Sequence, residues 1–299
     1  MKLRDLLALI YSTYKDNDTG LPYLCGGIAR SKAMHALGVS QDINKIEDLD
    51  ITTGDDTIHV LAKEFANRMG QNYKVDVKTG ADQHVSVNIR NFKIDFSSNF
   101  INPNIEMILG QMGIDHPTDM DKEMFSRDFT CNALLLTLDM KKLKDPTHHG
   151  FDDIKQKIIR TCLKPEITLS ANTNRIIRSI YFAAKLDFDL DKSIIEWIQK
   201  NGKLVNHSSE GYLQSMLEKS MAFNPDKTRF LLKQTGLEHF IMPPAPVKQA
   251  QYFRRNFDYG SDEELFSNLD KYKSVSDYRK KRRKKRKKII KKILDSKLK

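Results

Sequence analysis

The chain has 299 residues, of which 39% are hydrophobic and 30% are charged, and its formal net charge is +11. This composition is typical of a globular protein that is long enough to bury a sizeable core. No apolar run approaches the ~20 residues that a membrane-spanning helix needs, so we expect no membrane-embedded part.

The positive charge is concentrated at the end of the chain. Residues 279–299 hold 14 Lys and Arg and a single acid, Asp295, whereas residues 1–278 hold 36 basic and 38 acidic side chains. Only the tail therefore has the charge density that favours a polyanionic partner.

The three cysteines, Cys25, Cys131 and Cys162, lie in apolar stretches and lack the spacing of metal ligands. An odd number without such spacing is best explained by buried free thiols in a reducing compartment. The apolar stretch at the start of the chain is too short for a secretion signal. We therefore expect a cytoplasmic protein.

The first hundred residues alternate between helical and extended patterns. Apolar residues recur at spacings of three and four in the expected helices, and at every second position in most of the expected strands. The expected helices are 3–15, 30–37 and 55–69. The expected strands are 23–25, 47–52, 72–79, 84–90 and 91–98. Together they predict a small mixed sheet with helices packed against it.

The segment 99–124 is polar and rich in methionine, and Gly110, Gly113 and Pro117 interrupt any long element in it. Beside a functional site, such a stretch is a candidate mobile loop. From about residue 126 onward the pattern is mainly helical. The expected helices are 166–186, 191–201, 210–222 and 226–235.

The segment 24–53 carries the first candidate site. An apolar strand runs into Gly26 and Gly27, and paired glycines at the start of a helix let the backbone approach an anion. Asp48 and Asp50 are two positions apart on an expected strand, so their carboxylates leave the same face. A phosphate cradle that faces two carboxylates has the parts that magnesium-dependent nucleotidyl transfer needs. A glycine turn beside two surface acids would explain the same residue types.

These residues resemble the first motif of the class II tRNA nucleotidyltransferases and bacterial-type poly(A) polymerases, which reads Gly-Gly-x-x-Arg, a helix, and Asp-x-Asp. In this chain the motif stands as Gly26, Gly27 and Arg30, followed by Asp48 and Asp50. The resemblance implies that the two glycines and the arginine grip the triphosphate of a nucleotide. It also implies that the two aspartates are catalytic and hold two Mg²⁺ ions.

A third carboxylate follows on the expected strand 91–98. The family has a Glu followed by Val on a corresponding strand, and here the pair is Asp95-Phe96. The resemblance implies that Asp95 is catalytic, because a third acid would help to hold the metals or shift the pKa of the other two by repulsion. A strand acid that faces solvent is the alternative.

The most specific stretch runs from Ser126 to Leu134 and reads SRDFTCNAL. The family motif is Arg-Arg-Asp-Phe-Thr-x-Asn-Ala-Leu, so only Ser126 departs from it. By resemblance, Arg127, Asp128 and Asn132 bind the triphosphate and the ribose, and arginine suits this role because of its fixed fork of donors. A helix-capping Asp beside a surface Arg would explain the residue types but not the whole run.

The family's neck helix opens with Glu-Asp-x-x-Arg, in which the Asp and the Arg select the incoming base. The aligned residues 171–175 read ANTNR, so Arg175 is kept, as is Arg178 one turn later, while the Asp is replaced by Asn172. The resemblance implies that Asn172, Arg175 and Arg178 contact the nucleotide. Because an amide both accepts and donates hydrogen bonds, Asn172 would discriminate less against uracil than an aspartate would. Alternatively, Asn172 is only the N-cap of this helix.

The basic tail has few partners other than polyanions. Contacts with phosphates would be weakly sequence-specific and steeply dependent on salt. A solubilising or localising tail is the alternative. The residues expected to bind RNA are Arg279, Lys280, Lys281, Arg282, Arg283, Lys284, Lys285 and Arg286.

The resemblance covers roughly residues 20–200 and implies an α+β head followed by an all-α part. The head, residues 1–140, is expected to hold a mixed five-stranded nucleotidyltransferase sheet with flanking helices. A helical neck and body that binds RNA and the base is expected over 141–242, a short helical extension over 243–278 and the polybasic tail over 279–299.

The implied activity is template-independent addition of nucleotides from ATP or CTP to an RNA 3′ hydroxyl, with release of pyrophosphate. The expected acceptor is tRNA that receives CCA or its final A. The altered neck motif and the basic tail leave open a poly(A) polymerase that acts on other RNA. An RNA-binding protein with an inactive transferase fold is a further hypothesis, and retention of Asp48, Asp50, Arg127 and Asp128 argues against it. Transfer of a nucleotide onto a protein or a small molecule is a third.

Overall fold

The structure is a computed structural model that describes residues 3–40, 48–71, 75–79, 85–89, 92–97 and 102–241. The expected extension and the polybasic tail lie outside the described residues. Among the helices in these ranges, none has both the length and the apolar character needed to cross a membrane.

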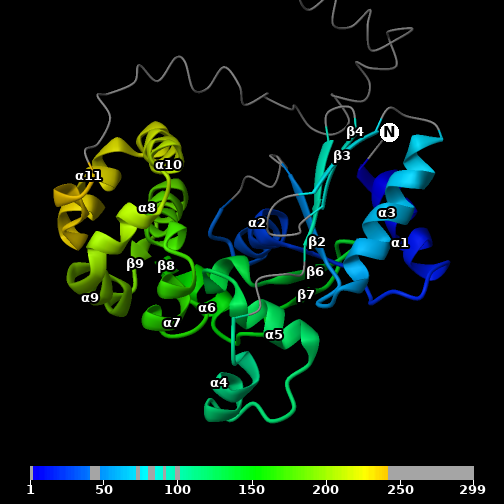
Figure 1. Cartoon of the computed structure of the whole chain (residues 1–299), viewed down its shortest axis with the longest axis horizontal. Helices are drawn as coiled ribbons and strands as arrows, with labels where there is room; N and C mark the ends of the chain where they lie inside the picture. Colours follow the sequence, from blue (N-terminus) through cyan, green and yellow to red (C-terminus); the bar gives the residue numbers. More distant parts are fainter. Residues whose placement is uncertain are drawn as a thin grey trace, which may run out of the picture. The chain divides into compact units, whose positions relative to one another are not determined.

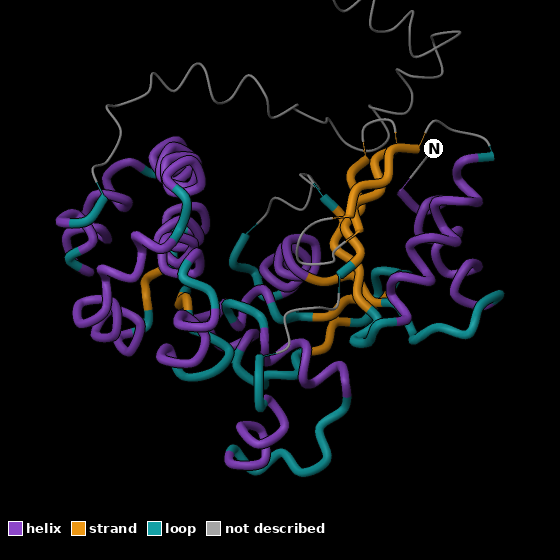
Figure 2. Tube along the Cα trace, in the orientation of Figure 1, coloured by secondary structure: helices purple, strands orange, loops and turns teal. Residues whose placement is uncertain are grey.

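A seven-stranded mixed sheet forms the centre of the head, in the order β3-β4-β5-β2-β1-β6-β7 (Figures 1 and 2). Within the described strands, β2 and β5 run parallel and the other neighbours are antiparallel. The strands are β1 (Tyr23–Cys25), β2 (Leu49–Thr52), β3 (Val75–Thr79), β4 (Val85–Ile89), β5 (Phe92–Phe96), β6 (Leu135–Thr137) and β7 (Leu143–Lys144).

The prediction of five strands was correct for β1 to β5 and missed β6 and β7. These two strands are three and two residues long, too short for an alternation of apolar and polar residues to be visible. β6 pairs with β1, so the segment that follows the SRDFTCNAL run lies beside the strand that leads into the glycine turn.

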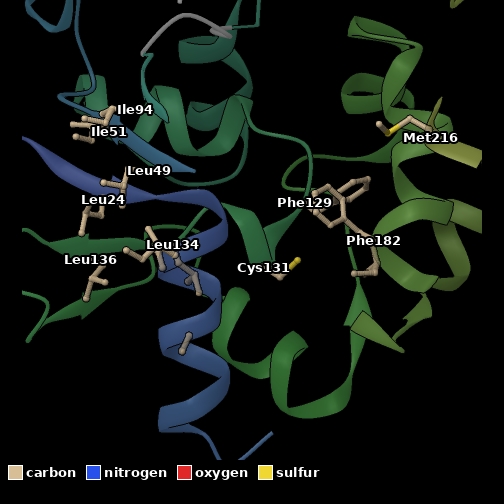
Figure 3. Packing of buried hydrophobic residues seen from close by; sticks show 14 of the residues in the cluster. Leu24, Leu49, Ile51, Ile94, Phe129, Cys131, Leu134, Leu136, Phe182 and Met216 are labelled. Atoms are coloured by element: carbon tan, nitrogen blue, oxygen red, sulfur yellow. The ribbon is translucent and has the colours of Figure 1, made fainter. Parts of the chain in front are cut away.

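Helices cover both faces of this sheet. Figure 1 shows α1 (Leu3–Lys15) and α3 (Thr57–Gly70) on one side and α2 (Gly26–Ala36) on the other. The alternation of side chains along β2 explains the arrangement, because Leu49 and Ile51 are fully buried in the core whereas Asp50 leaves the opposite face. Leu49 and Ile51 pack beside Ile94 of β5 (Figure 3).

The polar segment 99–124 contains two short helices, α4 (Ile105–Gln111) and α5 (Asp119–Ser126). α5 begins with a capping box, in which the hydroxyl of Thr118 accepts from the Asp121 amide and the Asp121 carboxylate accepts from the Thr118 amide. That this segment moves stays a prediction.

The chain beyond the sheet is mainly helical, as predicted. Its helices are α6 (Gly150–Gln156), α7 (Pro165–Ala171), α8 (Asn174–Leu186), α9 (Lys192–Asn201), α10 (Glu210–Phe223) and α11 (Pro225–Thr235). Short 3₁₀ turns lie at Thr130–Asn132, Gly202–His207 and Leu237–His239, and β8 (Ile158–Ile159) pairs in parallel with β9 (Asp189–Leu190).

The single helix expected over 166–186 is two helices, α7 and α8. The backbone of Asn172 is extended, with φ −152° and ψ 105°, and this ends α7. Oδ1 of Asn172 accepts a hydrogen bond of 3.0 Å from the amide of Asn174, where α8 begins. A side chain that competes with the helix for backbone donors in this way is typical of asparagine at helix boundaries.

Candidate active site

The glycine turn and Asp50 meet where β1 runs into α2. Cys25 pairs with Asp50 in the antiparallel register of β1 and β2. Gly26, the first residue of α2, has φ +62°, and a Cβ at this position would overlap Oδ2 of Asp50. The backbone amide of Gly27 donates a hydrogen bond to Asp50. Glycine is therefore required at position 26 both for its backbone conformation and for the close approach of the carboxylate.

The parallel register of β2 and β5 brings Asp95 next to Asp50. Side chains at paired positions of neighbouring strands leave the same face, so Asp50 and Asp95 lie side by side there. Asp48 is exposed at the start of β2 and acts electrostatically on Asp50. The structure thus brings together the three carboxylates that the sequence predicted to be catalytic.

The two oxygens of Asp95 are held by the chain itself. Oδ2 lies 2.5 Å from Nζ of Lys93, and Oδ1 accepts a hydrogen bond from the hydroxyl of Ser86. Burial tends to lower the pKa of Lys93, but the hydrogen bond to Asp95 and the charges of Asp95, Asp48 and Asp50 raise it overall. Lys93 therefore stays charged beside the carboxylates.

Burial raises the pKa of Asp50 above its ordinary value. The nearby Arg127 and the hydrogen bond from Gly27 lower it, whereas the negative charges of Asp95 and Asp48 raise it further. An ionised Asp50 is therefore poorly compensated by the protein alone. A bound cation would satisfy it.

Arg127 reaches this site from the end of α5. Its Nη2 donates to Oε1 of Glu123 over 2.8 Å and lies 3.1 Å from Sγ of Cys25. Oε2 of Glu123 accepts from the hydroxyl of Thr52 on β2. In the part of the chain that the structure describes, Nε of Arg127 is buried without a hydrogen-bond partner. Burial also raises the pKa of the Cys25 thiol to about 12, so this thiol is neutral at physiological pH.

A second polar network joins the head to α8. Arg30 of α2 donates to Oδ1 of Asn132, whose Nδ2 donates over 3.0 Å to Oδ1 of Asp128. Oδ2 of Asp128 accepts from both Nε and Nη2 of Arg178, at 2.9 and 2.5 Å. Although burial alone would raise it, Arg178 and Arg175 lower the pKa of Asp128 to about 2. Asp128 is thus ionised and fully paired.

The ring of Phe182 lies between the two arginines of this network. The guanidinium carbons of Arg30 and Arg178 are 5.2 and 5.1 Å from its centroid, within the range of a cation–π interaction. Phe182 also packs edge-on against Phe129, with centroids 5.8 Å apart (Figure 3). Nε of Arg30, like that of Arg127, is buried without a partner among the described residues.

Arg175 and Asn172 are engaged within the protein. Arg175 is 6% exposed, and its guanidinium donates to the backbone oxygens of Thr168 at 3.1 Å and Ser126 at 2.7 Å. Oδ1 of Asn172 accepts from the amide of Asn174, while the N-cap position of α8 itself is Thr173, one residue later than the capping alternative expected. A base contact by either residue stays a prediction, as do the roles of the tail arginines and lysines, which lie outside the described residues.

Sequence reasoning missed Glu123, Thr52, Ser86, Lys93 and Phe182. Two of these could have been found. Glu123 precedes Arg127 by four residues, which places the two side chains on one helical face, and Lys93 precedes Asp95 by two on a strand. Thr52, Ser86 and Phe182 join the site only through the fold.

The carboxylates are suited to a hard cation such as Mg²⁺, which is commonly held by one or two protein carboxylates together with substrate phosphates. Among the described residues, no group of three His, Cys, Asp or Glu side chains is arranged to hold a metal ion by itself. Asp50 lies against the start of α2, where phosphates would supply further oxygens, and Asp48 acts electrostatically on Asp50. The residues present therefore fit a metal that binds together with a nucleotide.

Comparison with known proteins identifies the domain that the head resembles. The model of the poly(A) polymerase head domain matches residues 22–160. A tRNA nucleotidyltransferase of Schizosaccharomyces pombe is 26% identical over 188 residues, which are 59% of this chain and 37% of that protein. The CCA-adding enzyme of Bacillus subtilis is 35% identical over 92 residues, 31% of this chain and 23% of that protein. The chain therefore spans well under half the length of these relatives.

Solved structures show the same fold. The CCA-adding enzyme of Bacillus stearothermophilus in complex with CTP is 23% identical and has a TM-score of 0.59, with 84% of this chain and 57% of that chain covered. A tRNA nucleotidyltransferase complexed with a primer tRNA and an incoming ATP analogue is also 23% identical, with a TM-score of 0.54, and 77% of this chain and 61% of that chain are covered. Residues 22–160 thus match the head domain found in class II tRNA nucleotidyltransferases and bacterial-type poly(A) polymerases, a family that generally uses divalent metal ions.

Proposed function

We propose that the protein is a template-independent RNA nucleotidyltransferase that adds nucleotides from CTP or ATP to the 3′ end of tRNA. The observation that carries the proposal is the position of the Asp50 carboxylate, which lies against Gly26 at the start of α2. This contact puts metal-binding oxygens next to a helix N-terminus, where phosphates bind favourably.

The triphosphate is assigned to the residues around this helix start. Gly26 and Gly27 present backbone to it, and Arg30 and Arg127 each have a buried Nε without a partner among the described residues. A phosphate oxygen would satisfy these donors. Asp128 and Asn132 hold the network in which Arg30 is fixed, and we assign them to orienting the nucleotide.

In the reaction, the 3′ oxygen of the RNA attacks the α-phosphorus of the nucleotide. A new ester bond forms, the bond to the bridging oxygen breaks, pyrophosphate leaves, and the proton of the 3′ hydroxyl is lost. Asp48 and Asp50 would hold two Mg²⁺ ions, with Asp95 beside them. When bound, the ions neutralise the phosphates and lower the pKa of the 3′ hydroxyl.

The base is assigned to the start of α8. Asn172 and Arg178 lie there, and Arg178 holds Asp128 while stacking on Phe182. Arg175 anchors the segment through its hydrogen bonds to Thr168 and Ser126 and would face the base only from this anchored position. An amide at position 172 relaxes the choice of base, and this favours poly(A) addition to other RNA as the second candidate function.

We assign the polybasic tail, residues 279–286 above all, to the phosphates of the RNA on the basis of its charge. We place the protein in the cytoplasm. All three cysteines are buried free thiols, and this suits a reducing compartment.

The test is incorporation of each labelled NTP separately, with Mg²⁺, into three acceptors: tRNA lacking CCA, tRNA ending in CC, and an unstructured oligonucleotide. We expect a short, fixed addition to the tRNAs that is lost in an Asp48→Ala/Asp50→Ala double variant. An open-ended ladder of A on the oligonucleotide would favour the poly(A) polymerase. RNA binding without incorporation by the unmodified protein would show an inactive transferase fold.

A further inference from the structure

The end of the sheet that carries Asp48, Asp50 and Asp95 also carries the ammonium group of Lys93. Lys93 and Asp95 are two positions apart on β5, so both leave the face on which Asp50 lies. Nζ of Lys93 is 2.5 Å from Oδ2 of Asp95, and the same ammonium group interacts electrostatically with Asp48 and Asp50. Lys93 is therefore a counter-charge to all three acids.

The Lys93 ammonium on Oδ2 of Asp95 would repel a metal ion that approached the same oxygen. The other oxygen, Oδ1, accepts from the hydroxyl of Ser86, which is 5% exposed on the neighbouring strand β4. A metal ion that bound Asp95 would therefore compete with Lys93 for the charge of this carboxylate. The Lys93 side chain is 43% exposed and has room to leave, whereas the Ser86 hydroxyl is buried.

We propose that Lys93 is a resident cation of the site and controls the loading of metal. It pairs with Asp95 and neutralises part of the charge of Asp48 and Asp50. A metal ion binds these carboxylates more tightly when Lys93 has moved away from Asp95. The inference rests on the proposed function and deepens it, because it names the residue that competes with metal in the proposed site.

An ordinary ion pair on a half-exposed strand is the competing explanation. Such a pair contributes little and would not alter binding of a divalent ion beyond its effect on net charge. The two explanations differ in what removal of the Lys93 charge does. If Lys93 competes with metal, its removal frees an oxygen ligand and also removes a nearby repulsive charge.

The test measures the affinity of the protein for Mn²⁺ by equilibrium dialysis, without nucleotide or RNA. We expect Lys93→Gln to bind Mn²⁺ about tenfold more tightly than wild type, since a positive charge a few ångströms from the ion is removed. Lys93→Arg keeps the charge and should stay close to wild type. Lys63→Gln, at an exposed position on α3, removes an equal charge on the other side of the sheet and should also leave the affinity unchanged. Equal or weaker binding by Lys93→Gln would overturn the proposal.

A second measurement needs no variant. The rate at which each lysine is acetylated is followed by mass spectrometry, with and without saturating Mn²⁺. We expect Lys93 to react severalfold faster in the presence of Mn²⁺, because it has left Asp95, while Lys63 reacts at an unchanged rate. An unchanged or slower reaction of Lys93 would contradict the proposal.

Failure of this inference and failure of the proposed function are distinguishable. Both measurements above use the metal alone, whereas the proposed function is tested by incorporation into RNA. If wild type adds no nucleotide but Lys93→Gln binds Mn²⁺ more tightly than wild type, the inference is supported and the proposed activity is refuted. If wild type adds nucleotides but Lys93→Gln leaves the Mn²⁺ affinity unchanged, the proposed activity is supported and the inference is refuted.

Discussion

Asp50 and Asp128 are both largely buried aspartates near arginines, and their carboxyl groups are in opposite electrostatic situations. Burial raises the pKa of Asp50, whose neighbour Arg127 gives its hydrogen bonds to Glu123 and Cys25. Asp128 receives two hydrogen bonds from Arg178, and its pKa falls to about 2. An arginine compensates a buried carboxylate when it is bonded to it, and much less when it is merely close.

The difference separates two parts of one site. At the end of the sheet, Asp50, Asp95 and Asp48 leave negative charge that the protein compensates only in part, through Lys93 and Arg127. At the junction with α8, each oxygen of Asp128 has a partner from the chain. We therefore assign the first part to binding cations. We assign the second to holding the head and α8 in register, and thereby to orienting the nucleotide.

The largest expected effect on stability comes from removing Asp128. Asp128→Ala leaves Arg178 without its carboxylate partner, and we expect it to lower the free energy of unfolding by about 3 kcal/mol, the lower end for a buried pair because the Arg178 side chain is 35% exposed. Asp50→Ala should not lower it, because the folded state disfavours the ionised form of Asp50. Urea unfolding at neutral pH, followed by circular dichroism, measures both. Asp226→Ala, at an exposed position on α11, is the control. Equal losses in free energy of unfolding for Asp128→Ala and Asp50→Ala would contradict the difference proposed between the two aspartates.

The pH dependence of stability should have opposite signs for the two aspartates. The folded pKa of Asp128, about 2, lies below its ordinary value of 3.8. Its contribution is therefore fully present above about pH 4 and is lost as the pH falls towards about 2, a total of about 2.5 kcal/mol. The folded pKa of Asp50 is raised, so its contribution is present below its ordinary pKa and is lost as the pH rises through the folded value.

Urea unfolding of wild type, Asp128→Ala and Asp50→Ala across this pH range checks the signs. The loss in free energy of unfolding caused by Asp128→Ala should become smaller as the pH falls. The free energy of unfolding of Asp50→Ala should increase relative to that of wild type as the pH rises. If both variants responded to pH in the same direction, the opposite assignments of the two carboxyl groups would be wrong.

Substitutions at Gly26 and Gly27 provide a matched pair with smaller expected effects on stability. Gly26→Ala combines a left-handed φ with an overlap on Asp50, and we expect it to cost about 1–3 kcal/mol of stability. A Cβ at Gly27 would meet only Nη2 of Arg30, at 3.9 Å, so Gly27→Ala should leave stability unchanged or raise it by up to about 1 kcal/mol. Thermal unfolding separates the two outcomes, and a large loss in Gly27→Ala would contradict this geometry.

The smallest effect concerns the choice of base. Asn172→Asp restores an acceptor-only side chain at the start of α8, and we expect discrimination against UTP to improve by about tenfold. The ratio of kcat/KM for ATP or CTP to that for UTP measures it. An unchanged ratio would mean that Asn172 serves only the turn between α7 and α8, through its hydrogen bond from the amide of Asn174.

Local sequence patterns predicted the elements that are long enough to show a period. The alternation in 84–90 and 91–98 located β4 and β5. The proximity of Gly26 to Asp50 agrees with the pattern that suggested the site, whose roles stay predictions. β6 and β7 are too short to show an alternation, and the break between α7 and α8 depends on one asparagine. The short helices α4 and α5 in the expected loop 99–124 are a further difference between the predicted and observed folds.

Local sequence patterns do not predict which residues from distant parts of the chain come together. The register that sets Asp95 beside Asp50 joins strands about forty residues apart, and spacing alone does not define it. The hydrogen bond from Arg175 to the backbone of Ser126 likewise spans 49 residues. The partnership of Lys93 with Asp95 was within reach, because both lie on one face of a single strand.

The central claim is that Asp50 takes part in metal-dependent nucleotidyl transfer while Asp128 supports the structure. The most direct test is single-turnover incorporation of labelled nucleotide into tRNA lacking CCA, with Mg²⁺, by wild type and Asp50→Asn. We expect wild type to extend the tRNA and the variant, folded by circular dichroism, to do so about 10³-fold more slowly. Equal rates for the two proteins would contradict the account.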